Sequence, residues 1–323
     1  MITFSELKKA GFIFDGATKW ISKSSAEDAL VTNPNTTFPV LATSFIAPEI
    51  IDILTAPRNA RLLGEEVKRG DWTTTYFDFP VREFTGGSTA YTDYGNGITS
   101  GVNYNFVPRK QYVFQTVITY GDREVDVANA ARINLIADKQ IAAAETLERD
   151  LNKYQLFGVP NTDITGIFND PGLNPSTSVS SWTSATTDTI YNDILTNLFN
   201  PLVTSSLGYV TATSDLKLAV SAAASVILGK KNQYGLSVLE MLKGYMPNLN
   251  VVVIPELANM AGGDTMFLIA DNIFGRTIEL PYGEKMRACR IILDETSYRQ
   301  KFVSSTYGAI VKYPMLISSI VGF

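Results

Sequence analysis

The side chains that could support catalysis in this sequence are few, and their spacing is unspecific. Paired carboxylates could supply the acid and base of a glycosidase-type site. Three acidic clusters offer such pairs: Glu148 with Asp150, Glu65 with Glu66, and Asp294 with Glu295. The first lies in a helical pattern typical of a solvated face, and the other two lie near predicted turns. We therefore interpret all three as surface charge.

Nucleophilic and metal chemistry lack their usual partners. The sequence contains no histidine, the commonest general base and metal ligand near neutral pH. No G-x-S-x-G motif is present, and S-x-x-K spacings arise too readily by chance to indicate a Ser-Lys dyad. The single cysteine, Cys289, lies in the apolar stretch MRACRIIL and excludes an intrachain disulfide. We predict no catalytic residue, no cofactor and no metal site.

The glycine-rich stretch LFGVPNTDITGIFNDPG, residues 156–172, is the remaining candidate for chemistry. A phosphate-binding loop opens a helix and, in its common form, contains Gly-Lys-Ser/Thr. This stretch instead follows a helical pattern, where exposed carbonyl groups disfavour phosphate. Gly158 and Pro160 are typical helix-terminating residues. We interpret the stretch as the exit from a helix.

The composition is typical either of a protein that is mostly interior or of one that is covered by copies of another subunit. Charged residues make up 18% of the chain, below the roughly 25% of an average soluble protein. The net charge is −5, and basic runs are short, so no face suited to gripping nucleic acid is expected. The sequence contains no run of about 18 apolar residues, so no membrane-spanning helix is expected.

The pattern along the chain predicts an arm, a projecting hairpin and a long helix. Residues 1–45 contain breakers and read as an extended arm, followed by a short helix in APEIIDILTAP. WTTTYFDFPVREF and YVFQTVITY read as two strands of a hairpin over 72–120, with a polar, glycine-rich tip. A helix is predicted over 126–158, with one core face formed by Ile133, Ala137, Ile141, Ala144, Leu147 and Leu151.

The second half of the chain predicts an α/β lobe and a strand-rich tail. Residues 186–285 contain the helical patterns TDTIYNDILTNLF, SDLKLAVSAAASVIL and SVLEMLKGYM. Ser214 is a plausible N-cap of the second pattern, and Ser237 with Glu240 has the spacing of a capping box. NVVVI, TMFLIA, RTIELP and MRACRIIL read as buried strands, and residues 286–323 return to strand character. The fold class is α+β.

Aromatic residues on the hairpin and the arm are candidates for contact with a partner. Stacking on nucleic-acid bases is disfavoured for an acidic chain, and a lone hairpin is marginal in water, which favours packing against another copy of the chain. The residues that we predict to make inter-subunit contacts are Phe84, Tyr91, Tyr94, Tyr104 and Phe106 on the hairpin, with Phe12 and Trp20 on the arm.

Three stretches of the sequence, together with the order of its parts, resemble a known family. ETLERDLNKYQLFGVPNTDITGIFNDP, SVLEMLKGYMPNLNVVVIPEL and SYRQKFVSSTYGAIVKYPMLI, together with the order of the parts, resemble major capsid proteins of tailed bacteriophages with the Hong Kong 97 (HK-97) fold. The first stretch resembles the long "spine" helix and the glycine-containing turn that follows it in phage capsids and encapsulins. The resemblance extends from about residue 40 to the end.

The resemblance implies a domain organisation for this chain. Residues 1–45 would be the N-terminal arm, 46–71 the start of the P-domain, and 72–120 the E-loop hairpin that lies over a neighbouring subunit. Residues 121–185 would continue the P-domain with its spine helix over 126–158. Residues 186–285 would form the A-domain, and 286–323 the C-terminal strands of the P-domain.

This sequence differs from some members of the family in two features, and each difference leads to an expectation. Some members weld their subunits through an isopeptide bond from a lysine on the E-loop, but no lysine lies between Lys68 and Lys110. We expect no such cross-link from the hairpin. Some members carry a fused scaffolding domain before the arm. Because the arm here begins almost at Met1, we expect a separate scaffolding protein or none.

The leading hypothesis from the resemblance is a phage major capsid protein that forms an icosahedral shell around double-stranded DNA. Its implied partners are other copies of itself in pentamers and hexamers, a portal, a separate scaffolding protein, a decoration protein, and DNA held non-specifically. It would be made in the host cytoplasm, reside in the virion and contact no membrane. The alternatives are an encapsulin-type compartment and, from another class, a soluble α/β enzyme. A tail or receptor-binding protein is disfavoured because no repeat is visible.

Overall fold

The structure is a computed structural model that describes residues 12–15, 19–22, 57–258, 260 and 263–323. The chain divides into two units, Met1–Thr55 and Ala56–Phe323. In the first unit, β1 (Phe12–Asp15) pairs antiparallel with β2 (Lys19–Ser22). The rest of the predicted arm, and nearly all of the predicted helix in APEIIDILTAP, lie outside the described residues.

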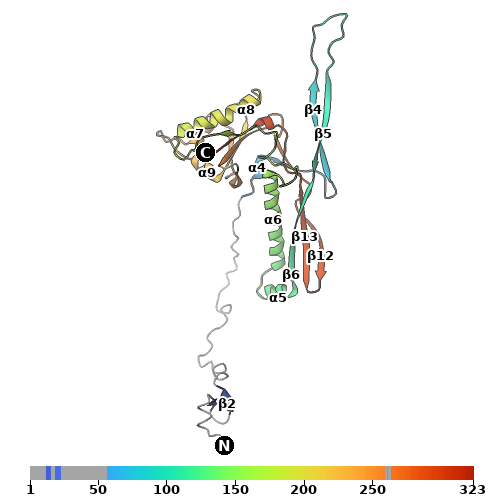
Figure 1. The fold of residues 1–323 in the computed structure, drawn as a ribbon, viewed down its shortest axis with the longest axis vertical. Helices are drawn as coiled ribbons and strands as arrows, with labels where there is room; N and C mark the ends of the chain where they lie inside the picture. Colours follow the sequence, from blue (N-terminus) through green and yellow to red (C-terminus); the bar gives the residue numbers. More distant parts are fainter. Residues whose placement is uncertain (1–11, 16–18, 23–56, 259, 261–262) are drawn as a thin grey trace. The chain divides into compact units, whose positions relative to one another are not determined.

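The second unit contains a lobe built on a five-stranded sheet (Figure 1). The strand order is β7 (Thr177–Ser178), β15 (Ile317–Val321), β10 (Thr265–Asp271), β8 (Asp215–Val220) and β9 (Leu249–Val253). The central strand β10 is buried along its whole length because both faces of the sheet are covered. The C-terminal strand β15 thus pairs within the sheet of the lobe.

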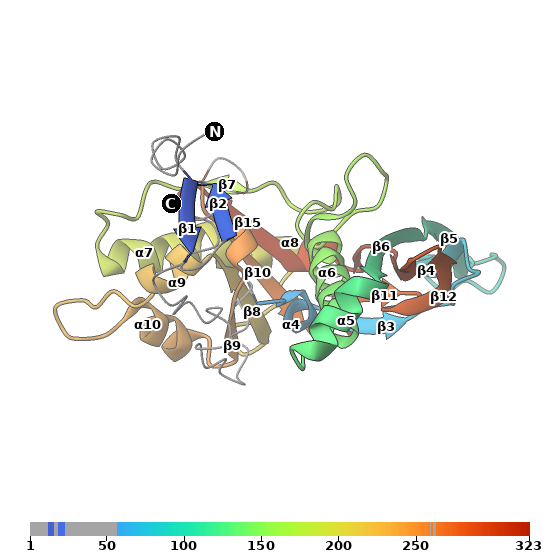
Figure 2. The same ribbon diagram turned by 90° about the horizontal axis from the view of Figure 1, so that it is seen from below.

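Helices cover one face of this sheet, as Figure 2 shows for α7, α9 and α10. The helical segments of the lobe are α7 (Thr187–Ile194), the π-helical η1 (Leu195–Phe199), α8 (Asn200–Ser205), α9 (Ala222–Ile227), α10 (Val238–Tyr245) and the 3-10 turns η2 (Pro255–Leu257) and η3 (Pro314–Leu316). Met266, Leu268 and Ala270 face these helices, whereas Phe267 and Ile269 face a second core. That second core includes Ala60 and Leu63 of the short helix α4 (Ala60–Leu63).

The helix predicted over SDLKLAVSAAASVIL is wrong in its first half. Residues 215–220 form strand β8, and the helix α9 begins only after Ser221, whose hydroxyl accepts from Ala224 N at 3.0 Å. Leu216, Leu218 and Val220 occupy alternate positions of the strand and face one core. The apolar residues of α9 follow directly and hide this alternation in the sequence. The capping box is confirmed, since Ser237 Oγ accepts from Glu240 N at 3.2 Å and Glu240 accepts from Ser237 N at 2.7 Å.

A second sheet extends away from the lobe (Figure 1). Its order is β12 (Arg287–Asp294), β13 (Ser297–Thr306), β11 (Ile278–Tyr282) and β14 (Ile310–Val311). Here β6 (Tyr112–Gly121) also pairs with β13, and β3 (Glu65–Lys68) pairs with β11. The prediction that MRACRIIL is a buried strand is wrong. Strand β12 is an edge strand, and its Ile291, Ile292 and Leu293 are exposed.

The predicted helix over 126–158 is two helices, α5 (Asp122–Ala130) and α6 (Leu135–Phe157). Between them Arg132 takes a left-handed backbone conformation with φ of 61°, which a continuous helix does not allow. Asn134 then caps α6 by accepting from Ala137 N at 3.4 Å. The helix ends at Gly158, with φ of 72°, as the sequence predicted.

The predicted core face of the helix is only half right. Leu147 and Leu151 are buried, and Ala137 and Ala144 are half-buried. Ile133 and Ile141, by contrast, are exposed. The face that packs on β6 and β13 contains Ala143, Leu147 and Leu151, which meet Phe114, Ile118 and Phe302. Three consecutive alanines at 142–144 let several faces fit the apolar pattern, and the aromatic residues of the sheet select one of them.

The predicted hairpin has a different second strand. Strand β4 (Tyr76–Thr85) pairs with β5 (Gly101–Lys110), whereas YVFQTVITY forms β6 and pairs with β13. The hairpin therefore spans residues 76–110 rather than 72–120. In strand β5, Val102, Tyr104 and Phe106 alternate with Asn103 and Asn105, but β6 has the longer apolar and aromatic run, which favours it as the second strand in the sequence.

The glycine-rich stretch is structural, in agreement with its interpretation as a helix exit. Ile167 N and Phe168 N donate back to the carbonyls of Gln155 and Leu156, at 2.9 and 3.0 Å. A Cβ on Gly166 would lie against the backbone of Leu156 and Gly158. Close backbone approach therefore requires glycine here.

Candidate subunit-interaction surfaces

One face of the β4–β5 hairpin carries most of its exposed apolar area. In the antiparallel register Phe84 lies opposite Val102, Arg82 opposite Tyr104, and Pro80 opposite Phe106. Because side chains alternate along a strand, these residues share one side of the hairpin with Tyr76. We call Tyr76, Phe84, Tyr104 and Phe106 the aromatic face. Their exposed fractions run from 58% for Tyr76 to 71% for Phe84.

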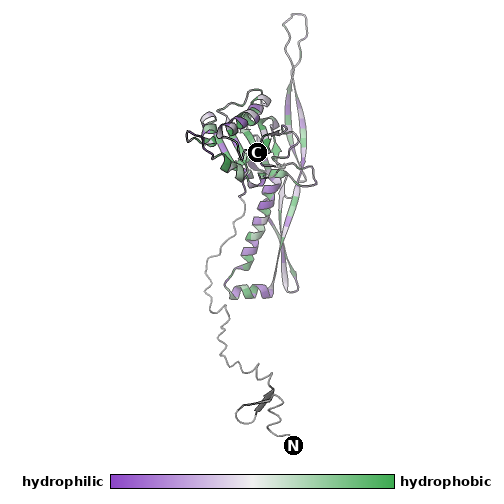
Figure 3. Cartoon of the chain, turned by 60° about the vertical axis from the view of Figure 1, so that its left-hand side comes forward, coloured by the Kyte–Doolittle hydropathy of each residue, from purple (hydrophilic) through white to green (hydrophobic). Residues whose placement is uncertain are grey.

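The aromatic face covers nothing within its own unit. Figure 3 shows apolar stretches along both strands of the projecting hairpin. Each strand has ten residues and is about 33 Å long. Arg82 lies over the ring of Phe84, with its guanidinium carbon 4.6 Å from the ring centroid. A two-stranded ribbon with exposed aromatics is marginal in water and normally packs against something.

The tip of the hairpin, residues 86–100, lies between the two strands. Tyr91 and Tyr94 there are 89% and 103% exposed, and Ile98 is exposed as well. These aromatics make no core contact within the described residues, so the tip extends the exposed apolar surface of the hairpin.

Polar contacts fix the base of the hairpin. Arg69, directly after β3, donates to Glu279 on β11 at 2.8 Å, and its guanidinium lies over the ring of Phe77 on β4 at 5.4 Å. Phe77 in turn meets Tyr307 edge-on, with centroids 5.9 Å apart. At the end of β5, Arg109 donates to Thr165 Oγ1 at 3.0 Å. The hairpin is therefore anchored to both β11 and the glycine-rich turn.

Glu279 is the buried charge at this base. Its side chain is 7% exposed and pairs with Arg69 and with Lys312, the latter at 2.7 Å. Burial alone would raise the pKa of Glu279, but hydrogen bonds from Arg69 and Lys312 outweigh it and hold the pKa below its usual value. The carboxylate thus stays ionised and holds two cations at the root of the hairpin.

A groove of about 930 Å³ runs beside the hairpin. Its walls combine Phe84 and Tyr104 of the aromatic face with Phe274, Tyr313 and Met315 of the body. Phe274 contacts Tyr313 at 5.5 Å and Tyr209 at 4.9 Å between centroids, and Phe274, Tyr209 and Met315 are exposed. The aromatic face and this body patch form one continuous apolar surface.

The structure locates the predicted contact residues. Phe84, Tyr91, Tyr94, Tyr104 and Phe106 all lie on the hairpin or its tip with exposed side chains. Their role in contacts between subunits stays a prediction. Phe12 and Trp20 lie in β1 and β2, and their side chains lie outside what the structure describes. Tyr76, Phe274 and Met315 were not predicted from the sequence, because only the fold brings the last two beside the hairpin.

Metal-binding clusters and membrane-spanning helices are absent from the described residues. No cluster of three or more metal-ligating side chains occurs in this part of the chain. Within the same residues, no helix combines the length and apolar character needed to cross a bilayer.

Comparison with known proteins identifies a family. The model of the Pa193 gp26 major capsid protein family matches residues 29–322, which is most of the chain. No curated protein sequence matches it.

Solved structures share the fold at low sequence identity. The capsid of Myoviridae phage XM1 is 16% identical with a TM-score of 0.73, covering 90% of this chain and 100% of that one. The capsid of a native GTA particle is 12% identical with a TM-score of 0.60, covering 91% and 98%. A structure from Mycobacterium phage Bobi is 10% identical with a TM-score of 0.61, covering 89% and 98%. The predicted HK-97-like fold is confirmed by these matches.

Proposed function

Because the chain belongs to the Pa193 gp26 major capsid protein family, we propose that its copies assemble, as pentamers and hexamers, into an icosahedral phage head around double-stranded DNA. A major capsid protein is a structural component of the virion. The family match therefore supports a shell subunit rather than an enzyme, and it does not favour the encapsulin alternative.

The observation that carries the proposal is the exposed aromatic face of the hairpin. Four aromatic side chains are exposed on a projecting two-stranded ribbon, beside an apolar groove of about 930 Å³. Such an exposed apolar surface is unfavourable in water and normally packs against a partner. In the shell, the hairpin of each copy covers a neighbour, as an E-loop does. Interlaced hairpins can bury more than the standard interface of about 1,600 Å².

The remaining assignments belong to the same proposal. Residues 1–45 act as the N-terminal arm, α6 as the spine helix of the P-domain, and the lobe built on β7, β15, β10, β8 and β9 as the A-domain. A net charge of −5 suits a wall that encloses DNA without binding it tightly. Portal, scaffolding and decoration proteins are expected partners, and the host cytoplasm is the expected place of synthesis.

The experiment replaces three members of the aromatic face in the full chain, Phe84→Ser, Tyr104→Ser and Phe106→Ser together. We expect wild-type protein to form particles or capsomers in sedimentation velocity and electron microscopy, and the variant to sediment as smaller species. The subunit should remain folded by circular dichroism, because these side chains are exposed and contribute little to its own core.

A matched control changes the opposite side of the same strand. Asn103 and Asn105 lie on β5 between the aromatic positions, so Asn103→Ser with Asn105→Ser disturbs the strand without removing aromatic area. This control should assemble as the wild type does. Unchanged assembly of the triple aromatic variant would refute the role of the aromatic face.

A further inference from the structure

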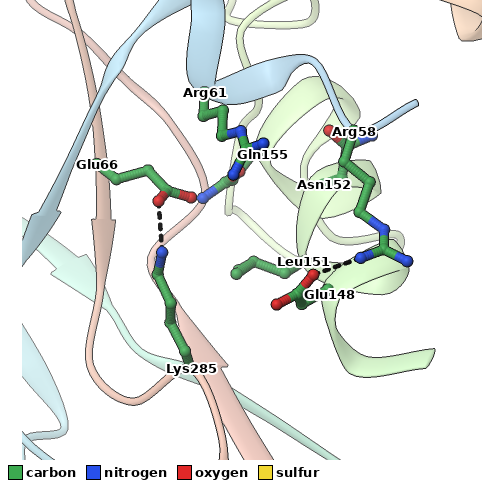
Figure 4. A pocket seen from close by; sticks show the side chains of 8 residues that line it. All are labelled: Arg58, Arg61, Glu66, Glu148, Leu151, Asn152, Gln155 and Lys285. Atoms are coloured by element: carbon green, nitrogen blue, oxygen red, sulfur yellow. Dashed lines mark hydrogen bonds and ion pairs between the residues drawn. The ribbon is translucent and has the colours of Figure 1, made fainter. Parts of the chain in front are cut away.

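The small pocket beside α6 is balanced in charge within the subunit. It has a volume of about 110 Å³, and Figure 4 shows the side chains that line it. Lys285 pairs with Glu66. Arg58 pairs with Glu148 and with Glu145. With the second arginine of the lining, three cations face three carboxylates, so the charges here create no demand for a ligand. Chemistry that the subunit does not use lies instead at the tip of the hairpin.

The hairpin tip contains the one Asn-Gly dipeptide of the sequence, Asn96 followed by Gly97. Asn-Gly often forms a tight turn of type I′ or type II, and both types require a positive φ at the glycine. In this structure neither Gly97 nor Asn96 has a positive φ. The usual structural reason for this dipeptide is therefore missing at the tip.

The surroundings of Asn96 leave its backbone free to move. Residues 91–100 are all exposed and belong to no helix or strand. Asn96 lies between Gly95 and Gly97, and glycine has the widest backbone freedom of any residue. The N–H of Gly97 donates to no backbone carbonyl among the described residues. The side-chain amide of Asn96 thus adjoins an accessible backbone nitrogen, as ring closure between the two requires.

We propose that Asn96 is a site of spontaneous deamidation in the free subunit. The backbone nitrogen of Gly97 attacks Cγ of Asn96 and closes a five-membered succinimide ring, while the bond from Cγ to Nδ2 breaks. The proton of the Gly97 nitrogen leaves with the side-chain nitrogen as ammonia. Water then opens the ring at one of its two C–N bonds to the Gly97 nitrogen and gives aspartate or isoaspartate. One water is consumed and one ammonia released, without oxidation or reduction.

The glycine after Asn96 distinguishes it from the other asparagines of the hairpin. A side chain at position 97 would crowd the attacking nitrogen, whereas glycine leaves it open. Asn103 and Asn105 on β5 are each followed by an aromatic residue and lie in the β4–β5 ladder. Their backbones are held extended by the pairing, which restricts ring closure. On the hairpin, only Asn96 combines exposure, backbone freedom and a following glycine.

Deamidation would act on assembly through the charge that it creates. This consequence rests on the proposed function, in which the hairpin covers a neighbouring copy. The new carboxylate would lie two residues from Tyr94 and from Ile98, which are exposed in the subunit and become covered in the shell. Burying a charge among apolar groups is unfavourable, and isoaspartate also lengthens the main chain by a methylene group. Aged free subunits should therefore assemble less readily.

The direct test is peptide mapping by mass spectrometry of the unassembled full chain after incubation in mildly alkaline buffer. Asn96 should lose its amide while Asn103 keeps it. A protein isoaspartate methyltransferase with labelled S-adenosylmethionine should label the peptide that contains Asn96. An intact Asn96, or equal loss of the amide at both positions, would overturn the proposal.

Gly97→Ala is the matched variant for the chemistry. An added Cβ would meet only Thr89 Oγ1, at an ordinary distance of 3.6 Å, so the variant should fold as the wild type does. It should keep the Asn96 amide over the time in which the wild type loses half of it. Loss of the amide at the wild-type rate in Gly97→Ala would overturn the proposed ring closure.

Two variants at position 96 test the consequence for the shell. Asn96→Asp has the charge of one product, and it should raise the concentration needed for assembly several-fold in sedimentation velocity. Asn96→Ser removes the amide without adding a charge and should assemble as the wild type does. Equal assembly of the two variants would overturn the effect on assembly. A wild-type chain that forms no shell would contradict the proposed function, whereas deamidation of the free subunit is measured without any shell.

Discussion

At the scale of single residues, two buried carboxylates connect segments that are far apart in the sequence. Glu279 pairs with Arg69 and Lys312 at the root of the hairpin. Asp271, at the end of β10, pairs with Lys217 at 2.9 Å and accepts from Thr277 N at 3.1 Å. Burial alone would raise the pKa of Asp271, but these hydrogen bonds outweigh it and lower the pKa. Both carboxylates therefore stabilise the fold as anions.

The stability of the subunit should consequently fall in acid. A carboxyl group whose pKa is lowered on folding contributes stability above its unfolded pKa, near 3.8 for Asp and 4.5 for Glu. That stability is lost as the pH falls through the folded value, since the unfolded state then binds more protons. Urea unfolding of the unassembled subunit should show a free energy of unfolding that declines below about pH 4.5.

Glu279→Gln should reduce this dependence on pH. At pH 7 the variant should lose about 1–3 kcal/mol, because two cations lose their partner while remaining partly exposed to water. Its stability should then fall less steeply in acid than that of the wild type. Glu83→Gln, on the exposed part of β4, serves as the control and should leave the pH profile unchanged. Equal acid sensitivity in Glu279→Gln and wild type would contradict the assignment.

The glycine-rich turn gives a second residue-scale prediction. A Cβ at Gly166 would meet backbone atoms of Leu156 and Gly158, which cannot rotate away, so Gly166→Ala should destabilise the subunit by about 1–3 kcal/mol. The control is Gly244→Ala, in helix α10, where a Cβ meets nothing within 4 Å. It should be neutral or stabilise by up to about 1 kcal/mol. Urea midpoints that rank the two variants the other way would exclude this role of Gly166.

At the scale of elements, local sequence signals predicted where helices begin and end better than they predicted which strands pair. The capping box at Ser237 and Glu240 and the stop at Gly158 are both confirmed, because each depends on residues within one turn. The partner of β4 was predicted wrongly, because pairing depends on register and on the rest of the sheet. The strand β8 was missed because its short alternation of Leu216, Leu218 and Val220 runs directly into the helical pattern of α9 after Ser221.

The corrected face of α6 makes an element-scale prediction. Leu147 is buried against β6 and β13, whereas Ile141 on the same helix is 61% exposed. Leu147→Ala should destabilise the unassembled subunit by about 2–5 kcal/mol through loss of buried apolar area and a new cavity. Ile141→Ala should change it by less than about 0.5 kcal/mol. Equal losses in thermal or urea unfolding would mean that the sequence-predicted face was the right one.

At the scale of the whole molecule, the order of the parts was more informative than any motif. An arm, a projecting hairpin, a long helix, a glycine-rich turn and an α/β lobe together resembled a capsid subunit, and the family match confirms that resemblance. The body part of the candidate surface could not be predicted. Phe274, Tyr313 and Met315 come to lie beside the hairpin only through folding, and no local pattern marks residues that become neighbours in this way.

In the proposed function, the exposed hairpin belongs to a shell built from copies of this chain. The most direct measurement is electron microscopy of the purified full chain, produced alone and together with the scaffolding protein of its phage. A shell subunit should form closed icosahedral shells, or pentamers and hexamers, in which residues 76–110 of each copy cover a neighbour. A chain that stays monomeric under both conditions, with its hairpin free in solution, would contradict it.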